Sequence, residues 1–164
     1  MNKPKAIVIA ILIAGIGYWS WGTLFPSAEK QIKETLQRLA EVASFGSNEK
    51  SLSRLGAINA VPRFFITNAV VRIAGGGYSR SLNGREEIRE AMAGSRAVAQ
   101  SLKINLTDPQ VTVVGPREAK VLVTATVYVD NDPNPQLQIL EMTMGREKRK
   151  WLIKRIDPID LNDI

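Results

Sequence analysis

The chain has 164 residues, 45% of them hydrophobic, which suits one domain with one core and argues against a disordered chain or a coiled coil. Cys and His are both absent, so the ligands of most zinc, copper, haem and iron–sulfur sites and the usual general base at neutral pH are missing, and we expect no cofactor and no metal. The net charge is +6, and the basic residues are spread along the chain apart from one cluster at 146–155. The stripe of basic and aromatic residues typical of nucleic-acid-binding proteins is missing, so we expect no nucleic-acid partner.

The first expected element is a transmembrane anchor at 6–25, which follows a cytoplasmic N-terminus at 1–5. No charged residue occurs between Lys5 and Glu29. The apolar stretch of about 20 residues matches the thickness of the hydrocarbon layer at 1.5 Å per helical residue. The residues expected to fix this anchor in the bilayer are two basic ones before it and three aromatic ones at its far end: Lys3, Lys5, Tyr18, Trp19 and Trp21.

The basic residues before the span also predict its orientation. Positive charges favour the cytoplasmic side, so the N-terminus is expected inside and the domain across the membrane, in the periplasm for a bacterial inner membrane. A cleaved signal peptide is the alternative, and it would give a secreted domain. The best small-residue cleavage signal, at 20–22, lies among aromatic residues, which favours a retained single-pass anchor.

The domain is expected at 27–159, with a tail at 160–164. Apolar residues at helical spacing predict helices at 27–44, with Ser27 as N-cap, and at 48–60. The second helix should bury Leu52, Leu55 and Ile58. A turn at Thr67-Asn68 should precede two short strands at 70–73 and 78–82. A third helix should start at Asn83, with Glu86 completing a capping box.

The C-terminal half switches to the alternating pattern of β-strands. Its expected strands lie at 101–107, 111–114, 119–130, 137–144 and 151–156. A bend or bulge is expected at Asp108-Pro109, and alternate residues from Val121 to Val129 should share one face. Three helices followed by a meander predict an α+β fold, with the helices on one side of a curved, mostly antiparallel sheet.

Four segments, in order, carry a family resemblance: PRFFITNAVVRI, NGREEIREAM, VTVVGPREAKVLVTATVYV and WLIKRI. Together they resemble the nuclear transport factor 2-like superfamily in its SnoaL-like branch, over 27–159. The resemblance implies a cone in which the sheet wraps the helices around an internal pocket, and an outer sheet face that often forms a dimer. The superfamily includes isomerases, dehydratases and non-catalytic adaptors, so the fold does not fix the function. Where enzymatic relatives often carry acidic residues this chain has Asn68 and Ile73, which do not accept a proton at neutral pH, and this argues against a conventional enzyme.

Glu141 is the best remaining catalytic candidate. A carboxylate inside an apolar cone would have a raised pKa and could serve as an acid or base. The alternative, which the sequence favours, is a cross-strand ion pair with Lys154 outside the cone.

Seven residues are candidates for contact with a ligand or partner: Arg72, Tyr128, Met142, Trp151, Lys148, Arg149 and Lys150. Arg72 points either into the pocket or out to solvent, and Tyr128 lies either at a pocket mouth or on a polar outer face. Met142 and Trp151 belong either to the core or to an adaptable contact surface. The basic turn at 148–150 is either solvated or in contact with anionic lipid or an acidic partner.

The leading hypothesis is a non-catalytic, membrane-anchored interaction or assembly module, whose extracytoplasmic domain docks a protein partner or its own copy. The alternative is a small-molecule-binding protein, or a SnoaL-like isomerase or lyase that acts on an apolar ligand in the cone. The first hypothesis predicts a cone that is filled or dry and an apolar patch on the outer sheet face. The second predicts an ionisable group such as Glu141 in a closed pocket.

Overall fold

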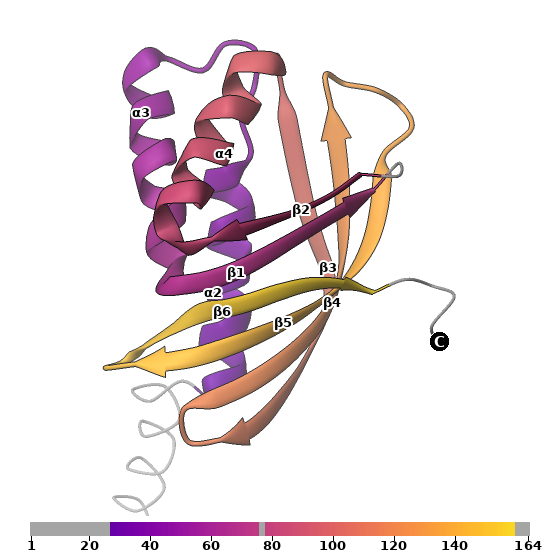
Figure 1. Ribbon diagram of the computed structural model, residues 1–164. Coiled ribbons are helices and arrows are strands. Elements are labelled where there is room, and N and C mark those ends of the chain that lie inside the picture. The colour runs from indigo at the N-terminus through magenta and orange to yellow at the C-terminus, as the bar shows by residue number, and fades with distance from the viewer. Residues whose placement is uncertain (1–26, 76–77, 160–164) are drawn as a thin grey trace, which may run out of the picture.

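The computed structural model describes residues 27–75 and 78–159, which form three α-helices, one short 3-10 helix and a six-stranded sheet (Figure 1). The helices are α2 (Ala28–Ala43), α3 (Ser51–Ala60), η1 (Val61–Phe64) and α4 (Gly84–Val98). The strands are β1 (Phe65–Gly75), β2 (Tyr78–Asn83), β3 (Leu102–Gly115), β4 (Glu118–Val129), β5 (Gln136–Glu147) and β6 (Lys150–Ile159).

The strand order in the sheet is β2-β1-β6-β5-β4-β3. All neighbours are antiparallel except β1 and β6, which are parallel. In Figure 1 the sheet curves strongly, so that β1 and β2 run across the direction of β3 and β4, and the helices lie together on one side. This is the predicted α+β layout of helices against a curved, mostly antiparallel sheet.

Helix α2 forms where the apolar spacing predicts it. The Ser27 hydroxyl oxygen accepts a hydrogen bond from the backbone N–H of Lys30 at 3.2 Å, which confirms the expected N-cap. Ile32, Leu36 and Leu39 follow one another on the buried face, which packs against β3 and β6.

The inward face predicted for the second helix is wrong. Leu52 and Leu55 are 85% and 57% exposed, and α3 has no buried residue. The helix itself forms, but it packs mainly on η1 and α4 at the rim of the domain. A helical pattern gives α3 an apolar stripe, whereas burial also requires a surface to lie against that stripe.

Two local predictions around β1 and α4 are also corrected. Thr67 and Asn68 lie within β1, which continues from Phe65 to Gly75, and the only trace of a turn there is an irregular register with β6 before Val70. Asn83 is the N-cap of α4 but makes no side-chain capping bond. Its backbone N–H donates to Glu87 Oε2 at 2.7 Å, so Glu87 takes the place expected for Glu86.

The bulge expected at Asp108-Pro109 is confirmed. The pairing of β3 with β4 shifts register between Thr107 and Gln110, and Asp108 has a φ of 51°. The two strands expected on either side of it form one continuous β3, because a bulge bends a strand without ending its pairing.

The core lies between the sheet and the helices. The alternation expected along β4 is confirmed from Val121 to Ala125, where every second residue is buried, but it does not continue to Val129, which is 37% exposed. Met142, Met144, Trp151 and Ile153 extend this surface across β5 and β6, and the whole joins α2 in one cluster. Of the two alternatives for Met142 and Trp151, the structure has them in the core, at 2% and 3% exposure.

Within the described part of the chain, no helix is long and apolar enough to cross a bilayer. The anchor expected at 6–25 and the tail at 160–164 lie outside that part, as do Lys3, Lys5, Tyr18, Trp19 and Trp21.

Candidate functional site

The cone interior, where the resemblance implies a pocket, is occupied by side chains of the protein itself. The residues that fill it are apolar, buried and contiguous: Ile32, Leu36, Val121, Val123, Met142, Met144, Ile153 and Ile156. None of the four clefts described along 27–75 and 78–159 is lined by Val121, Val123 or Met144.

Arg96 is the one charged side chain that is buried among the described residues. Its Nε lies 3.2 Å from the Glu49 carboxylate, and its Nη2 donates to the backbone carbonyl of Val42 at 3.2 Å. Its guanidinium carbon lies 4.6 Å from the centre of the Phe45 ring. This group ties the end of α4 to the loop after α2.

Arg96 was not among the residues predicted from the sequence, although its spacing along α4 indicates a buried position. Ile88, Met92 and Arg96 follow one another at intervals of four along α4, so Arg96 continues the buried stripe of that helix. A charged residue at such a position is expected to have a buried counter-ion, and Glu49 provides it.

Glu141 does not lie inside the cone, and the expected ion pair with Lys154 is wrong. The Glu141 side chain is 43% exposed, and its carboxylate lies 3.6 Å from Lys120 Nζ on the neighbouring strand. Lys154 pairs with Glu118 at 3.1 Å. The hairpin closes on a tight turn at Lys148 and Arg149, and a register shift between Thr143 and Met144 adds one residue to the offset. Asp157 and not Lys154 therefore stands opposite Glu141.

The outer face of the sheet carries apolar residues between exposed ion pairs. Cross-strand pairing puts Leu122 beside Glu141 and sets Leu137 and Ile139 opposite two threonines of β4. Leu137 is 68% exposed and Leu122 is 38% exposed.

The same outer face also holds Arg72, which points out to solvent and bonds Asp157 at 3.0 Å. Asn68 and Ile73, the positions compared with enzymatic acids, both lie at the surface. Tyr128 is half-buried and lines a separate open hollow with Phe45 and Asn131.

A cleft lined by several cationic side chains lies between α2, η1 and the β5–β6 hairpin. We call it the basic cleft. Its volume is about 400 Å³. The cleft is lined by four cationic side chains, one carboxylate and six other residues: Arg38, Arg63, Arg149, Lys150, Glu34, Gln31, Thr35, Ala60, Phe64, Trp151 and Leu152. Arg149, Lys150 and Trp151 are three of the contact candidates predicted from sequence, whereas Lys148 is in the turn at a φ of 55° and does not line the cleft.

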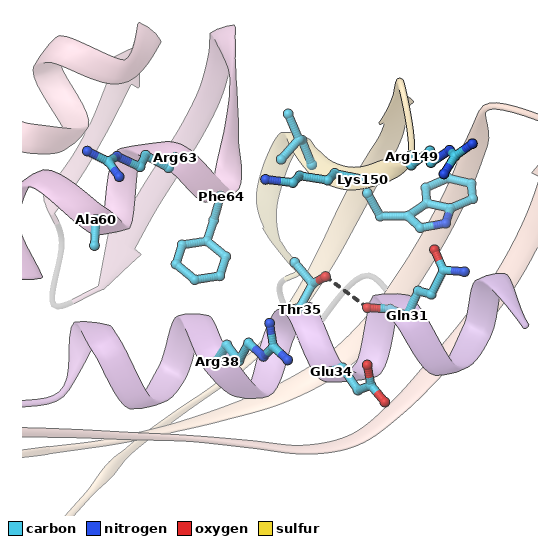
Figure 2. A pocket seen from close by; sticks show the side chains of 11 residues that line it. Gln31, Glu34, Thr35, Arg38, Ala60, Arg63, Phe64, Arg149 and Lys150 are labelled. Carbon is cyan, nitrogen blue, oxygen red and sulfur yellow. Dashed lines mark hydrogen bonds between the residues drawn. The ribbon is translucent and has the colours of Figure 1, made fainter. Parts of the chain in front are cut away.

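Figure 2 shows how these side chains lie. Arg38 rises from α2 and Lys150 reaches from the hairpin on the opposite side of the gap, with Phe64 and Thr35 between them in this view. The carboxylate of Glu34 lies on the side of α2 away from Lys150. The Thr35 hydroxyl donates to the Gln31 carbonyl at 2.8 Å, so this proton is already used within the helix.

Solved structures with the same architecture are numerous, although no family model and no curated protein matches the sequence significantly. An NTF2-like protein with a cystatin-like fold from Novosphingobium aromaticivorans superposes with a TM-score of 0.66 at 15% identity, covering 93% of this chain and 90% of that one. The fold is that of the nuclear transport factor 2-like proteins. The predicted architecture of the domain is thereby supported.

Two further neighbours have different kinds of function. A candidate scytalone dehydratase from the same organism has a TM-score of 0.56 at 12% identity, with 80% of this chain and 84% of that chain covered. A candidate calcium/calmodulin-dependent protein kinase II association domain from Xanthomonas campestris has a TM-score of 0.60 at 11% identity, with 84% and 91% covered. The fold is therefore shared by an enzyme-type and an association-type protein, and it does not decide between them.

Proposed function

We propose that this protein is a non-catalytic assembly module that associates with a second copy of itself through the outer face of its sheet. The proposal rests on the filled cone. The interior surface of the sheet is covered by Val121, Val123, Met142 and Met144, each 2% exposed or less, where a ligand-binding relative would need free volume. We therefore expect the domain to act through contacts made by its outer surfaces.

The outer sheet face supports self-association for two reasons. Leu122, Leu137 and Ile139 present apolar surface to solvent along β4 and β5, and such a patch with a polar rim is typical of protein interfaces. The rim also carries both signs of charge, because Lys120 pairs with Glu141 while Arg72 and Arg155 share Asp157. In a second copy turned about a two-fold axis, the cations of one face can meet the carboxylates of the other.

The expected anchor gives this module a location, which is part of the proposal. If residues 6–25 span a bacterial inner membrane, the domain lies on its periplasmic side, and confinement to two dimensions favours association between copies. The segment lies outside the described residues, so its test is separate. N-terminal sequencing of the mature protein should give Met1 or Asn2, whereas a start near Thr23 would favour a secreted protein.

The alternative is a small-molecule-binding protein or a SnoaL-like isomerase or lyase. Such an enzyme needs an acid or base beside an apolar ligand in the cone. The geometry supports this less, because Glu141 is on the outer face and the interior of the described domain is packed with aliphatic and sulfur-containing side chains.

Sedimentation velocity on the full-length protein in a mild detergent tests the proposal. The wild-type chain should form a dimer or larger assembly whose population rises with concentration. Leu137→Glu should weaken this association about tenfold or more, because it puts a charge on the most exposed residue of the apolar patch. Leu137 is 68% exposed in the single chain, so the substitution should leave folding intact.

Leu52→Glu is the matched control, since Leu52 is even more exposed but lies on α3, away from the sheet. This variant should associate like the wild type. A wild-type chain that stays monomeric at every concentration would overturn the proposal, and so would equal weakening by the two variants. In either case the face that we assign would not be the site of association.

A further inference from the structure

The basic cleft brings together cationic side chains from three separate segments of the chain. Arg38 comes from α2, Arg63 from η1, and Arg149 and Lys150 from the β5–β6 hairpin. None of the seven ion pairs formed by the described residues includes any of these four. Glu34 is the one carboxylate among the described lining residues, so the cleft carries an excess of positive charge.

A second, independent feature of the same cleft is an unused hydrogen-bond donor. Trp151 lines the cleft and is 3% exposed, and its indole Nε1 has no hydrogen-bond partner within the described residues. Buried indole N–H groups usually have an acceptor, because leaving one unsatisfied costs the free energy of its lost hydration. The Nε1 atom is itself covered by neighbouring atoms, so it lies beside the open space of the cleft and does not face it.

These two features specify the chemistry of a ligand. It must be anionic, and it must offer acceptor oxygens in more than one direction, because Arg38 and Lys150 stand on opposite sides of the gap in Figure 2. A phosphate group has three or four such oxygens and about two charges, and Arg side chains bind it through paired donors. A carboxylate offers two oxygens in one plane and matches this arrangement less well.

We propose that the basic cleft is a binding site for a phosphate group, contributed by a soluble phosphorylated molecule or by a phospholipid headgroup. Arg38 and Lys150 hold the phosphate from opposite sides, and the buried indole N–H of Trp151 senses the bound charge from beneath the wall of the cleft. The volume of about 400 Å³ leaves room for more than the phosphate, and Phe64 supplies an aromatic wall for an apolar part of the ligand. The site goes beyond the proposed assembly function and does not depend on it, since none of its lining residues belongs to the outer-face patch.

The test uses the indole N–H of Trp151 as a reporter in the full-length chain. Trp19→Phe and Trp21→Phe, both outside the described residues, leave Trp151 as the single tryptophan, so its Nε1–H resonance in a ¹H–¹⁵N spectrum needs no further assignment. Titration with inorganic phosphate should shift this resonance in a saturable manner. In this background, Arg38→Gln with Lys150→Gln should weaken binding about a hundredfold, at about tenfold for each charged hydrogen bond lost.

The control pair, Arg80→Gln with Lys103→Gln, removes the same charge from exposed positions that do not line the basic cleft. It should leave the phosphate affinity within about twofold of the unsubstituted protein, since screening by salt weakens distant charges. All four substituted cations are exposed, so neither pair should disturb folding, and the dispersion of the backbone amide resonances checks this.

A second arm distinguishes the two sources of the phosphate. The same chain is combined with phosphatidylcholine vesicles, with and without phosphatidic acid. A shift of the Trp151 resonance that requires phosphatidic acid, Arg38 and Lys150 supports a headgroup ligand, and a shift with inorganic phosphate alone supports a soluble one. The proposal is overturned if neither phosphate source moves the resonance, or if the cleft pair and the control pair have the same effect.

Discussion

Removing the carboxylate of Glu49 is expected to destabilise the domain more than removing its partner, Arg96. The reason lies in their unequal burial: the Arg96 side chain is 1% exposed and that of Glu49 is 15% exposed. Glu49→Ala leaves a charged guanidinium buried with only the Val42 carbonyl and the Phe45 ring as partners. Arg96→Met leaves a carboxylate that water can reach, and it also removes the buried Nη1 that has no partner.

The magnitudes follow from this difference. An unpaired buried charge costs ~3–5 kcal/mol, and Glu49→Ala should fall near the lower limit because two other contacts to Arg96 remain. Arg96→Met should cost about 1 kcal/mol, since it gives up a cation–π contact but keeps the packing of an unbranched side chain against Phe45. The double variant should match Arg96→Met alone, because no buried charge is left unpaired.

Urea denaturation of the full-length chain, followed by far-UV circular dichroism, measures all three variants. With a slope of about 1.5 kcal/mol per molar urea, Glu49→Ala should lower the midpoint by about 2 M and Arg96→Met by less than 1 M. The reasoning is refuted if Arg96→Met is the more damaging variant, or if the two single effects simply add in the double variant. Either result would mean that Arg96 contributes mainly by packing and not through its charge.

Three further predictions concern other parts of the domain. Gly84→Ala should cost about 1.5 kcal/mol, because Gly84 has a φ of 81° and a Cβ there would lie 3.1 Å from a backbone carbonyl oxygen. Gly94→Ala is the matched control inside α4, where a Cβ meets nothing within 4 Å. This control should stabilise the domain by about 0.7 kcal/mol in the same urea assay. Met144→Ala should cost about 3 kcal/mol through the cavity it opens, since Met144 is 0% exposed in the filled cone. A loss of stability below about 1 kcal/mol would indicate that the cone already contains free space. The side-chain hydrogen bond from Arg89 lowers the pKa of Glu86; desolvation opposes this shift and the positive charge of Arg89 adds to it. An NMR titration should therefore find that Arg89→Met raises the pKa of Glu86. The stability linked to this pair is present above the unfolded pKa of the carboxyl and is lost as the pH falls through the folded pKa.

Local sequence patterns determined the elements of this fold. Helical spacing and a Ser N-cap predict α2, and alternation predicts the buried face of β4, because both depend only on residues within a few positions of each other. The bulge at Asp108 follows in the same way from an Asp-Pro pair inside an alternating strand. The resemblance to the nuclear transport factor 2-like superfamily then supplied the cone, which the pattern of elements alone does not give.

Only the tertiary structure decided which surfaces meet. The apolar stripe of α3 stays exposed because no strand lies beneath it. The position of the β5–β6 turn, together with one register shift, sets Asp157 opposite Glu141, and Lys154 pairs with Glu118. The basic cleft depends on residues more than 100 positions apart, from Arg38 to Lys150, which no local pattern connects. Periodicity is a property of neighbouring residues, whereas burial, ion pairing and sites are properties of segments that fold onto one another, and the sequence carries no short-range signal for them.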